Sequence, residues 1–191
     1  MNPQHLPEII KNQRITLKKH SLDLAALMFS FVDQDRLRLQ NFLPWVNQTK
    51  SVQDEIEYIQ VTHRNWEAFA SYDFGIYRNH DDQYLGNIGI HTISWANNRC
   101  EIGYWILGIY QGQGFVSEAV ILLENTCFEM GFHRLEIHCS SKNVKSMNVP
   151  KRCGYELEGT FKQDSIENGE YRDTHVFGKI QNSKKRSFNL K

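Results

Sequence analysis

The chain has 191 residues, with 22 basic and 22 acidic side chains and a formal net charge of zero at pH 7. Its length and its hydrophobic fraction of 40% suit one domain with one core, and the balanced charge excludes a general attraction for nucleic acid or an anionic membrane. No apolar stretch has the length of a membrane span and no secretory signal is present, so we expect a cytoplasmic protein without membrane contact.

The first part of the chain predicts a short strand followed by helices. Residues 1–12 hold two of the four prolines and are expected to lead into a domain that spans residues 13–181. Apolar and polar residues alternate over 15–17, which indicates a strand. Apolar residues over 22–32 recur at helical spacing, and a second helical stretch ends before Pro44 because proline breaks a helix.

The middle of the chain changes from helical to extended patterns. Ser51 followed by Asp54 resembles a capping box, which opens a helix that runs to about Trp66. From Ser71 onward, alternating apolar residues and polar turns predict three strands joined as an antiparallel meander. The last of these strands covers residues 100–107 and is strongly apolar.

A glycine-rich turn, Gln-Gly-Gln-Gly at 111–114, then leads into a helix over residues 116–130 with Gly131 at its C-terminal cap. Glycines let a main chain approach phosphates closely. The first N–H groups of a helix lack internal partners, and the helix dipole adds positive charge there. A strand, such a turn and a helix therefore predict an anion-binding site, although a tight connection without a ligand explains the pattern equally simply.

Two common nucleotide motifs do not fit this turn. A P-loop ends in Gly-Lys-Ser/Thr, which is absent here. The dinucleotide fingerprint requires a third glycine where Ser117 stands, and its acidic ribose ligand has no counterpart because Glu136 lies in the middle of a strand. A nicotinamide-dependent dehydrogenase is therefore excluded.

The last part of the chain completes a mixed α/β domain. Residues 135–139 alternate as a strand, and Asn143 is a candidate N-cap for a short helix that reaches Arg152. Two further strands flank the turn at 167–169. Residues 182–191 form a basic tail for which we expect a disordered, solvated state.

The turn at 111–114 resembles the coenzyme A pyrophosphate loop of the GNAT acetyltransferase superfamily, Gln/Arg-x-x-Gly-x-Gly/Ala. The sequence here is Gln111-Gly112-Gln113-Gly114-Phe115-Val116. Val116 departs at the last small position, but its side chain can point into the core. Three further segments resemble the RimJ/RimL-type branch, which includes ribosomal-protein N-terminal acetyltransferases: Phe42-Leu43-Pro44-Trp45-Val46, Ile102-Gly103-Tyr104-Trp105-Ile106 and Asn143-x-x-Ser146. The similarity covers about residues 14–180.

This resemblance implies a GNAT acyl-CoA N-acyltransferase fold, a mostly antiparallel twisted sheet that splays at the coenzyme A site and is flanked by helices. It implies acetyl-CoA as cosubstrate, no metal, and a primary amine as acceptor, foremost a protein N-terminal α-amine. Relatives in this branch are often dimers, which makes a homodimer one candidate assembly, while the sequence leaves the oligomeric state open. The implied coenzyme-binding residues are Ile106, Leu107, Gln111, Gly112, Gln113, Gly114, Phe115, Val116, Ser117, Asn143 and Ser146.

The resemblance also implies three catalytic candidates. Glu101 begins a strand at the position where some GNAT enzymes place a general base, although a surface ion pair or a water relay is the alternative. Ser146 is the general-acid candidate, with a simple helix-start residue as the alternative. Cys139 is expected beside the coenzyme thiol or, alternatively, in the core. Pro150 has no N–H for the carbonyl of Ser146, which predicts a locally opened helix there.

Other polar and aromatic residues have simpler interpretations. His138 alternates to the strand face opposite Cys139, and His91 is expected to be a satisfied polar residue. The four cysteines form no C-x-x-C pair and the histidines have no metal-ligand spacing. Most aromatic residues, Tyr104 among them, are expected in the core, whereas Trp45 lies in the region that shapes acceptor pockets in this superfamily. A small-molecule amine acceptor (an antibiotic or polyamine) and a coenzyme A-binding sensor without catalysis remain the competing functions.

Overall fold

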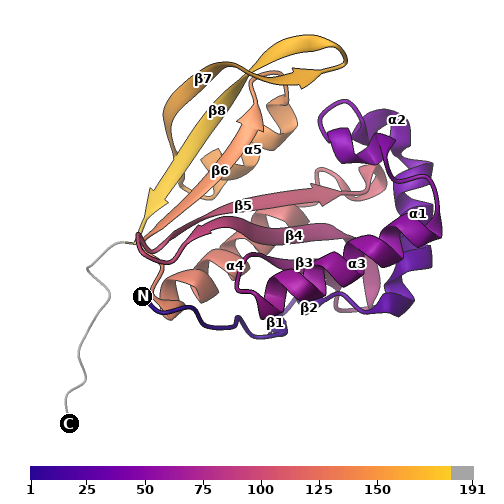
Figure 1. Ribbon diagram of the computed structural model, residues 1–191, viewed down its shortest axis with the longest axis horizontal. Helices are drawn as coiled ribbons and strands as arrows, with labels where there is room; N and C mark the ends of the chain where they lie inside the picture. Colours follow the sequence, from indigo (N-terminus) through magenta and orange to yellow (C-terminus); the bar gives the residue numbers. More distant parts are fainter. Residues whose placement is uncertain (182–191) are drawn as a thin grey trace.

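The computed structural model describes residues 1–181; residues 182–191, on which the prediction of a disordered tail falls, lie outside this part. The described chain forms one eight-stranded sheet with helices on both faces (Figure 1). Its strands are β1 (Ile9–Lys11), β2 (Ile15–Lys19), β3 (Tyr72–Arg78), β4 (Gln83–Ser94), β5 (Arg99–Ile106), β6 (Arg134–Ser140), β7 (Glu156–Glu167) and β8 (Glu170–Ile180). Its helices are α1 (Ala25–Gln34), α2 (Arg36–Leu39), α3 (Val52–Glu67), α4 (Phe115–Met130) and α5 (Val144–Arg152), with short 3-10 turns η1 (Leu22–Leu24), η2 (Pro44–Asn47) and η3 (Gly108–Tyr110).

The mixed α/β class and the antiparallel meander are confirmed. The sheet order is β1-β2-β3-β4-β5-β6-β8-β7, and neighbouring strands are antiparallel except β5 and β6. The capping box at the start of α3 is present, because Asp54 N donates to Ser51 Oγ at 3.4 Å and Ser51 N donates to Asp54 Oδ2 at 2.8 Å. Helix α4 ends at Gly131, whose φ of +105° is the left-handed cap expected there.

The N-terminal segment is more closely integrated than the predicted lead-in. Residues 9–11 form β1 at the edge of the sheet, where they pair with β2. The side chains of Leu6 and Ile10 are buried in the main core, and the Met1 ammonium donates to the Trp95 carbonyl at 2.9 Å. A three-residue strand is too short to show a periodic pattern, so the sequence alone did not reveal it.

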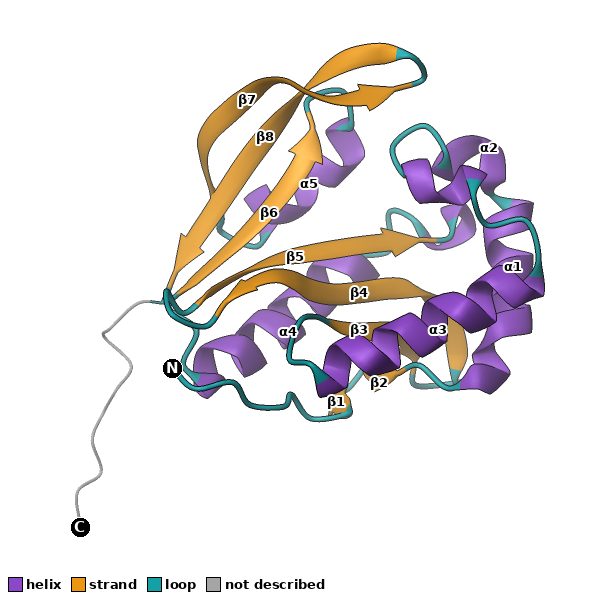
Figure 2. Cartoon of the chain, viewed as in Figure 1, coloured by secondary structure: helices purple, strands orange, loops and turns teal. Residues whose placement is uncertain are grey.

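The sheet separates two groups of helices, with α4 on one face and α1 and α3 on the other (Figure 2). Side chains of β5 alternate between these faces. Ile102 and Tyr104 pack against the main core beneath α4, whereas Trp105 packs against the smaller cores formed with α1 and with η2. Residues of β5 with odd numbers, Glu101 among them, therefore face the side of α1 and α3.

The sheet splays between β5 and β6. These strands pair in parallel at three positions, from Arg99 opposite Arg134 to Glu101 opposite Glu136, and then diverge. Beyond that point β6 pairs with β8 alone, and Figure 1 shows the strands β6, β8 and β7 turning away from β5. The edge of β5 after Glu101 therefore borders an opening inside the sheet. None of the helices in residues 1–181 combines the length and the apolar character needed to cross a bilayer.

Candidate functional site

The turn after β5 offers a row of unpaired main-chain donors. Gly112 and Gly114 have φ values of +76° and +84°, and a Cβ atom at either position would meet no heavy atom within 4 Å. The first main-chain bond of α4 runs from Glu118 N to Gly114 O at 3.0 Å. Within residues 1–181, no hydrogen bond engages the N–H groups of residues 112–117. The turn is thus open toward solvent and its donors are available to an anion.

The side chains at the start of α4 anchor the turn without closing it. Phe115 is buried, and Val116 packs against the same core, as the sequence predicted for this departure from the family pattern. Gln113 Nε2 donates to the Ile109 carbonyl at 3.0 Å, which fixes the turn to η3. These contacts leave the main chain of the turn exposed.

Three basic residues surround this turn, and sequence reasoning missed all of them. Lys145 Nζ donates to Gln111 Oε1 at 2.8 Å, and Arg152 Nε donates to Ser117 Oγ at 3.2 Å. Arg14 Nη2 donates to the Gln113 carbonyl at 3.4 Å. Lys145 and Arg152 lie seven positions apart on α5, a spacing that places them on one helix face. Positive charge therefore reinforces the donors of the turn.

Ser146, Tyr104 and Cys139 lie together across the opening between β5 and α5. Asn143 Oδ1 accepts from Ser146 N at 3.1 Å, which confirms Asn143 as the N-cap of α5. Ser146 Oγ donates to Tyr104 Oη at 3.4 Å. Burial raises the pKa of the Cys139 thiol to about 11, although its contact with Ser146 acts in the opposite direction. Cys139 is therefore a protonated thiol at neutral pH.

Pro150 leaves the carbonyl of Ser146 without a helical donor, and Tyr104 supplies one from outside the helix. Tyr104 Oη donates to the Ser146 carbonyl at 3.2 Å. Helix α5 nevertheless continues through Pro150 without a break. The predicted opening is therefore limited to the Ser146 carbonyl, which lacks its helical hydrogen bond and is free to accept from Tyr104. Burial also raises the pKa of Tyr104 well above its usual value, which keeps the phenol protonated. Tyr104 packs against the main core, as expected, and is also part of the site.

The main chain at the end of β5 corrects one predicted donor. Leu107 N donates to the Leu85 carbonyl of β4 at 3.0 Å, so the expectation that this amide faces a coenzyme was wrong. Successive residues of a strand direct their N–H and C=O groups to opposite edges. The N–H groups of Ile106 and Tyr104 therefore point toward the edge from which β6 diverges. The Ile106 carbonyl at this edge accepts from Arg38 Nη2 at 2.6 Å. Ile106 therefore remains a candidate donor, and Tyr104 joins it.

Glu101 lies on the opposite face of β5, between two histidines. Its Oε2 is 3.6 Å from His138 Nδ1 on β6 and 3.9 Å from His91 Nδ1 on β4. Its side chain is mostly buried, with 18% exposed. Gly103, two residues on, has no side chain, and a Cβ atom there would lie 3.0 Å from His91 Nε2. The absence of a side chain at Gly103 therefore leaves room for the His91 ring beside Glu101.

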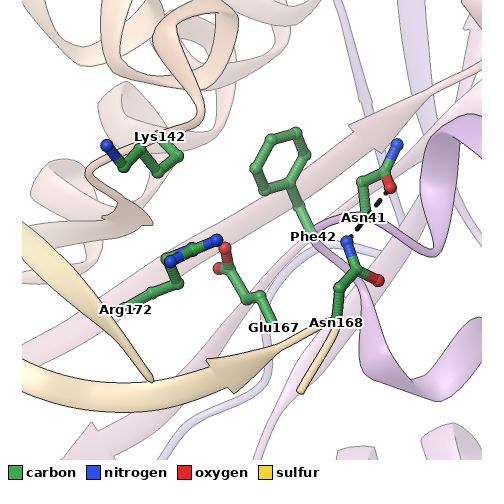
Figure 3. Close-up of a pocket in the computed structure, with 6 residues that line it drawn as sticks. All are labelled: Asn41, Phe42, Lys142, Glu167, Asn168 and Arg172. Carbon is green, nitrogen blue, oxygen red and sulfur yellow. Dashed lines mark hydrogen bonds between the residues drawn. The ribbon is translucent and has the colours of Figure 1, made fainter. Parts of the chain in front are cut away.

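A cavity of about 230 Å³ lies on the side of α2, between the loop at 41–42 and the turn that joins β7 to β8 (Figure 3). Asn168 Nδ2 in this turn donates to Asn41 Oδ1 at 3.3 Å, and Glu167 Oε2 accepts from Ser140 Oγ at 2.9 Å. Its lining residues are Asn41, Phe42, Lys142, Glu167, Asn168 and Arg172. Phe42, from the segment 42–46 singled out in the sequence, thus borders this cavity.

Comparisons with known proteins agree with this geometry. The family described as acetyltransferase (GNAT) domain matches residues 14–156. The ribosomal-protein-serine acetyltransferase of Escherichia coli (strain K12) is 29% identical over 157 residues, which cover 82% of this chain and 87% of that protein. The microcin C7 self-immunity acetyltransferase MccE, solved with acetyl-CoA and AMP, has a TM-score of 0.85 at 25% identity, with 89% of this chain and 94% of that chain covered. The ribosomal L7/L12 α-N-protein acetyltransferase RimL, solved with coenzyme A joined to one of its cysteines by a disulfide, has a TM-score of 0.86 at 24% identity, with 91% of this chain and 98% of that chain covered.

Proposed function

Because the chain belongs to the acetyltransferase (GNAT) family, we propose that it transfers the acetyl group of acetyl-coenzyme A to the α-amine of a protein N-terminus. The observation that supports this most strongly is the open turn at residues 112–117, with its unpaired N–H groups at the start of α4. A diphosphate is the ligand for which such a turn is suited, because it accepts several hydrogen bonds and carries negative charge.

The donor would occupy the opening between β5 and β6. Its diphosphate would bind the main chain of the turn, with Lys145 and Arg152 adding positive charge. Its amide-containing arm would pair with the free edge of β5 at Tyr104 and Ile106, as an added strand does. The acetyl thioester would then lie near Ser146, within reach of the N–H groups of this edge.

The chain's own residues account for both proton movements of the reaction. The neutral amine attacks the thioester carbonyl, the carbon–nitrogen bond forms, and the carbon–sulfur bond breaks. Glu101 takes a proton from the amine directly or through water, and the departing thiolate takes the proton of Ser146 Oγ. Tyr104 Oη accepts from Ser146 Oγ and donates to the Ser146 carbonyl, so it orients the serine hydroxyl, and solvent returns the proton that Ser146 loses. The N–H donors of β5 stabilise the oxyanion formed between these steps.

An N-terminal amine is the acceptor that this arrangement suits best. The pKa of an α-ammonium is about 8, against about 10.4 for lysine, so a single carboxylate with a nearby histidine suffices to deprotonate it. The cavity beside Phe42 and Arg172 would receive the residues that follow the amine. The similarity to a ribosomal-protein-serine acetyltransferase supports the same acceptor.

Two measurements test this proposal. Acetyl-coenzyme A should raise the melting temperature, since a ligand that binds the folded state alone stabilises it, whereas NADH should not. Free-thiol release should then be fastest with short peptides that carry ribosomal-protein N-termini, compared with a panel of polyamines and aminoglycosides. Faster thiol release with the small amines would show that the acceptor is a small amine and not a protein N-terminus. Thermal stabilisation by acetyl-coenzyme A without thiol release in the presence of any amine would show that the protein is a coenzyme A sensor.

A further inference from the structure

Two histidines flank Glu101, and they differ in what holds them. His138 Nδ1 lies 3.6 Å from Glu101 Oε2, while its Nε2 lies 3.0 Å from Glu136 Oε2. The imidazole of His138 therefore lies between two carboxylates that come from neighbouring strands. Its side chain is 24% exposed, so part of it remains in contact with solvent.

Glu136 is itself fixed, which sets the orientation of His138. Glu136 Oε1 accepts from Arg134 Nε at 2.8 Å and from Arg99 Nη1 at 3.2 Å. These ion pairs lower the pKa of Glu136 against the effect of its burial. A carboxylate that stays ionised accepts a hydrogen bond from His138 Nε2, and this assigns the proton of a neutral ring to Nε2. Nδ1, which lies 3.6 Å from Glu101 Oε2, then carries the lone pair.

His91 lacks this arrangement. Its Nδ1 is 3.9 Å from Glu101 Oε2 but already contacts Thr92 Oγ1 at 3.0 Å, and 46% of its side chain is exposed. Within residues 1–181, no second carboxylate forms an ion pair with it. His91 thus provides a comparison within the same site, a histidine at a similar distance from the same carboxylate without a fixed tautomer.

We propose that His138 is the proton relay of Glu101, an inference that depends on Glu101 being the base proposed above. Glu101 first takes the proton of the acceptor amine and becomes a carboxylic acid. That proton passes to Nδ1 of His138, which regenerates the Glu101 carboxylate and produces an imidazolium between two carboxylates. The imidazolium releases the Nδ1 proton to solvent before the next turnover. His138 acts through Glu101 and is a positioning and relay residue.

The groups that face His138 from each neighbouring element favour this charge change. Glu101 approaches from β5 and Glu136 from β6 itself, and both stabilise a positive ring. Phe161 from β7 meets the ring edge-on at 6.0 Å and carries no charge. Arg134 and Arg99 lie beyond Glu136 and are paired with it, so they do not oppose the imidazolium directly.

The test uses the full-length protein and whichever amine of the panel the wild type acetylates fastest, so it does not depend on the acceptor proposed above. His138→Asn keeps an N–H donor near the position of Nδ1, and His138→Gln keeps one near the position of Nε2. Neither amide can accept and release a proton as an imidazole does. We expect kcat to fall about 10- to 100-fold in both, less than most of the roughly 10²–10⁴-fold that a direct acid or base contributes, because His138 acts through Glu101. KM for acetyl-CoA should be unchanged. We also expect the acidic limb of the kcat profile against pH to move. His91→Asn is the matched control and should stay within about twofold of wild type.

Chemical rescue separates a relay from a purely structural histidine. Imidazole in the buffer should restore a large part of the kcat lost in His138→Gly, whereas it should leave His91→Gly unchanged. Wild-type kcat and pH profile in His138→Asn, or equal losses in His138→Asn and His91→Asn, would overturn the proposal. Full activity of Glu101→Gln would also overturn it while leaving acetyl transfer itself intact. A failure of the proposed acceptor would show separately, as wild-type activity on small amines without activity on peptides.

Discussion

At the scale of single residues, the two glycines of the turn after β5 combine two requirements. Their positive φ values favour glycine, and the space above them is empty within 4 Å. A diphosphate needs that space, because its oxygens must reach the main-chain N–H groups directly. A larger residue at either glycine would therefore both strain the backbone and block the phosphate. A test of the turn has to distinguish these two effects.

Gly114→Val should abolish acetyl-coenzyme A binding, because the valine side chain would occupy the position of the phosphate. Calorimetric titration of the purified variant measures this. Gly154→Val is the matched control, since Gly154 has a similar φ of +78° and equally empty surroundings. Both substitutions cost about 1–2 kcal/mol of backbone strain. Undiminished affinity in Gly114→Val, or an equal loss in Gly154→Val, would contradict the assignment of the turn.

Ser146 and Tyr104 should act as one unit in protonating the leaving thiolate. Ser146→Ala and Tyr104→Phe should each lower kcat, by about tenfold or more, and the double variant should lose little beyond the worse single variant. Affinity for acetyl-coenzyme A should change little in all three. Losses of kcat that multiply in the double variant would show that the two hydroxyls act independently. Steady-state kinetics at saturating acceptor provide the measurement.

At the scale of elements, α3 buries a carboxyl group without a full set of partners. Glu55 is buried, and within the described residues no donor reaches its Oε1. Burial raises its pKa to about 7, and the nearby charge of Asp54 adds to the effect. The folded state therefore holds this proton more tightly than the unfolded state does. Between pH 4.5 and 7, Glu55 ionises in the unfolded chain but stays protonated in the folded one, and this favours unfolding.

Glu55→Gln should consequently gain stability relative to wild type as pH rises. At about 1.4 kcal/mol per pKa unit, the relative gain between pH 4.5 and pH 8 should be about 2–3 kcal/mol. Urea unfolding at both pH values measures the difference. Glu57→Gln, on the exposed side of the same helix, makes the same substitution at a glutamate outside the core and serves as the control. A difference between Glu55→Gln and wild type that is independent of pH would contradict the raised pKa.

At the scale of the whole molecule, residues before the expected domain start at 13 pack with the sheet. Leu6 is 2% exposed and belongs to the same core as the strands of the sheet. Leu6→Ala should therefore lower the free energy of unfolding by about 2–5 kcal/mol, the usual cost of a buried leucine. Leu37→Ala, at a leucine that is 80% exposed, should change it by less than about 0.5 kcal/mol. Equal effects of the two substitutions on the free energy of unfolding would show that residues 1–12 do not contribute to the core.

The order of elements could be predicted because the signals are local. The capping box at Ser51, the turn at 111–114 and the cap at Asn143 each depend on residues within a few positions of one another. The pairs that complete the site do not: Lys145 reaches Gln111 across 34 positions of sequence, and Tyr104 reaches Ser146 across 42. Such contacts follow from the order of strands in the sheet, which a single sequence does not specify.

The divergence of β5 from β6 has a consequence for the solubility of the protein. Beyond Glu101, β5 presents an unpaired edge inside the molecule, of the kind by which strands of different chains aggregate. Arg38 covers the Ile106 carbonyl at the end of this edge, but cover over the N–H groups of Tyr104 and Ile106 would conflict with ligand entry. An enzyme filled with its coenzyme should therefore tolerate high concentration and storage better than the empty enzyme, independently of any change in its rate.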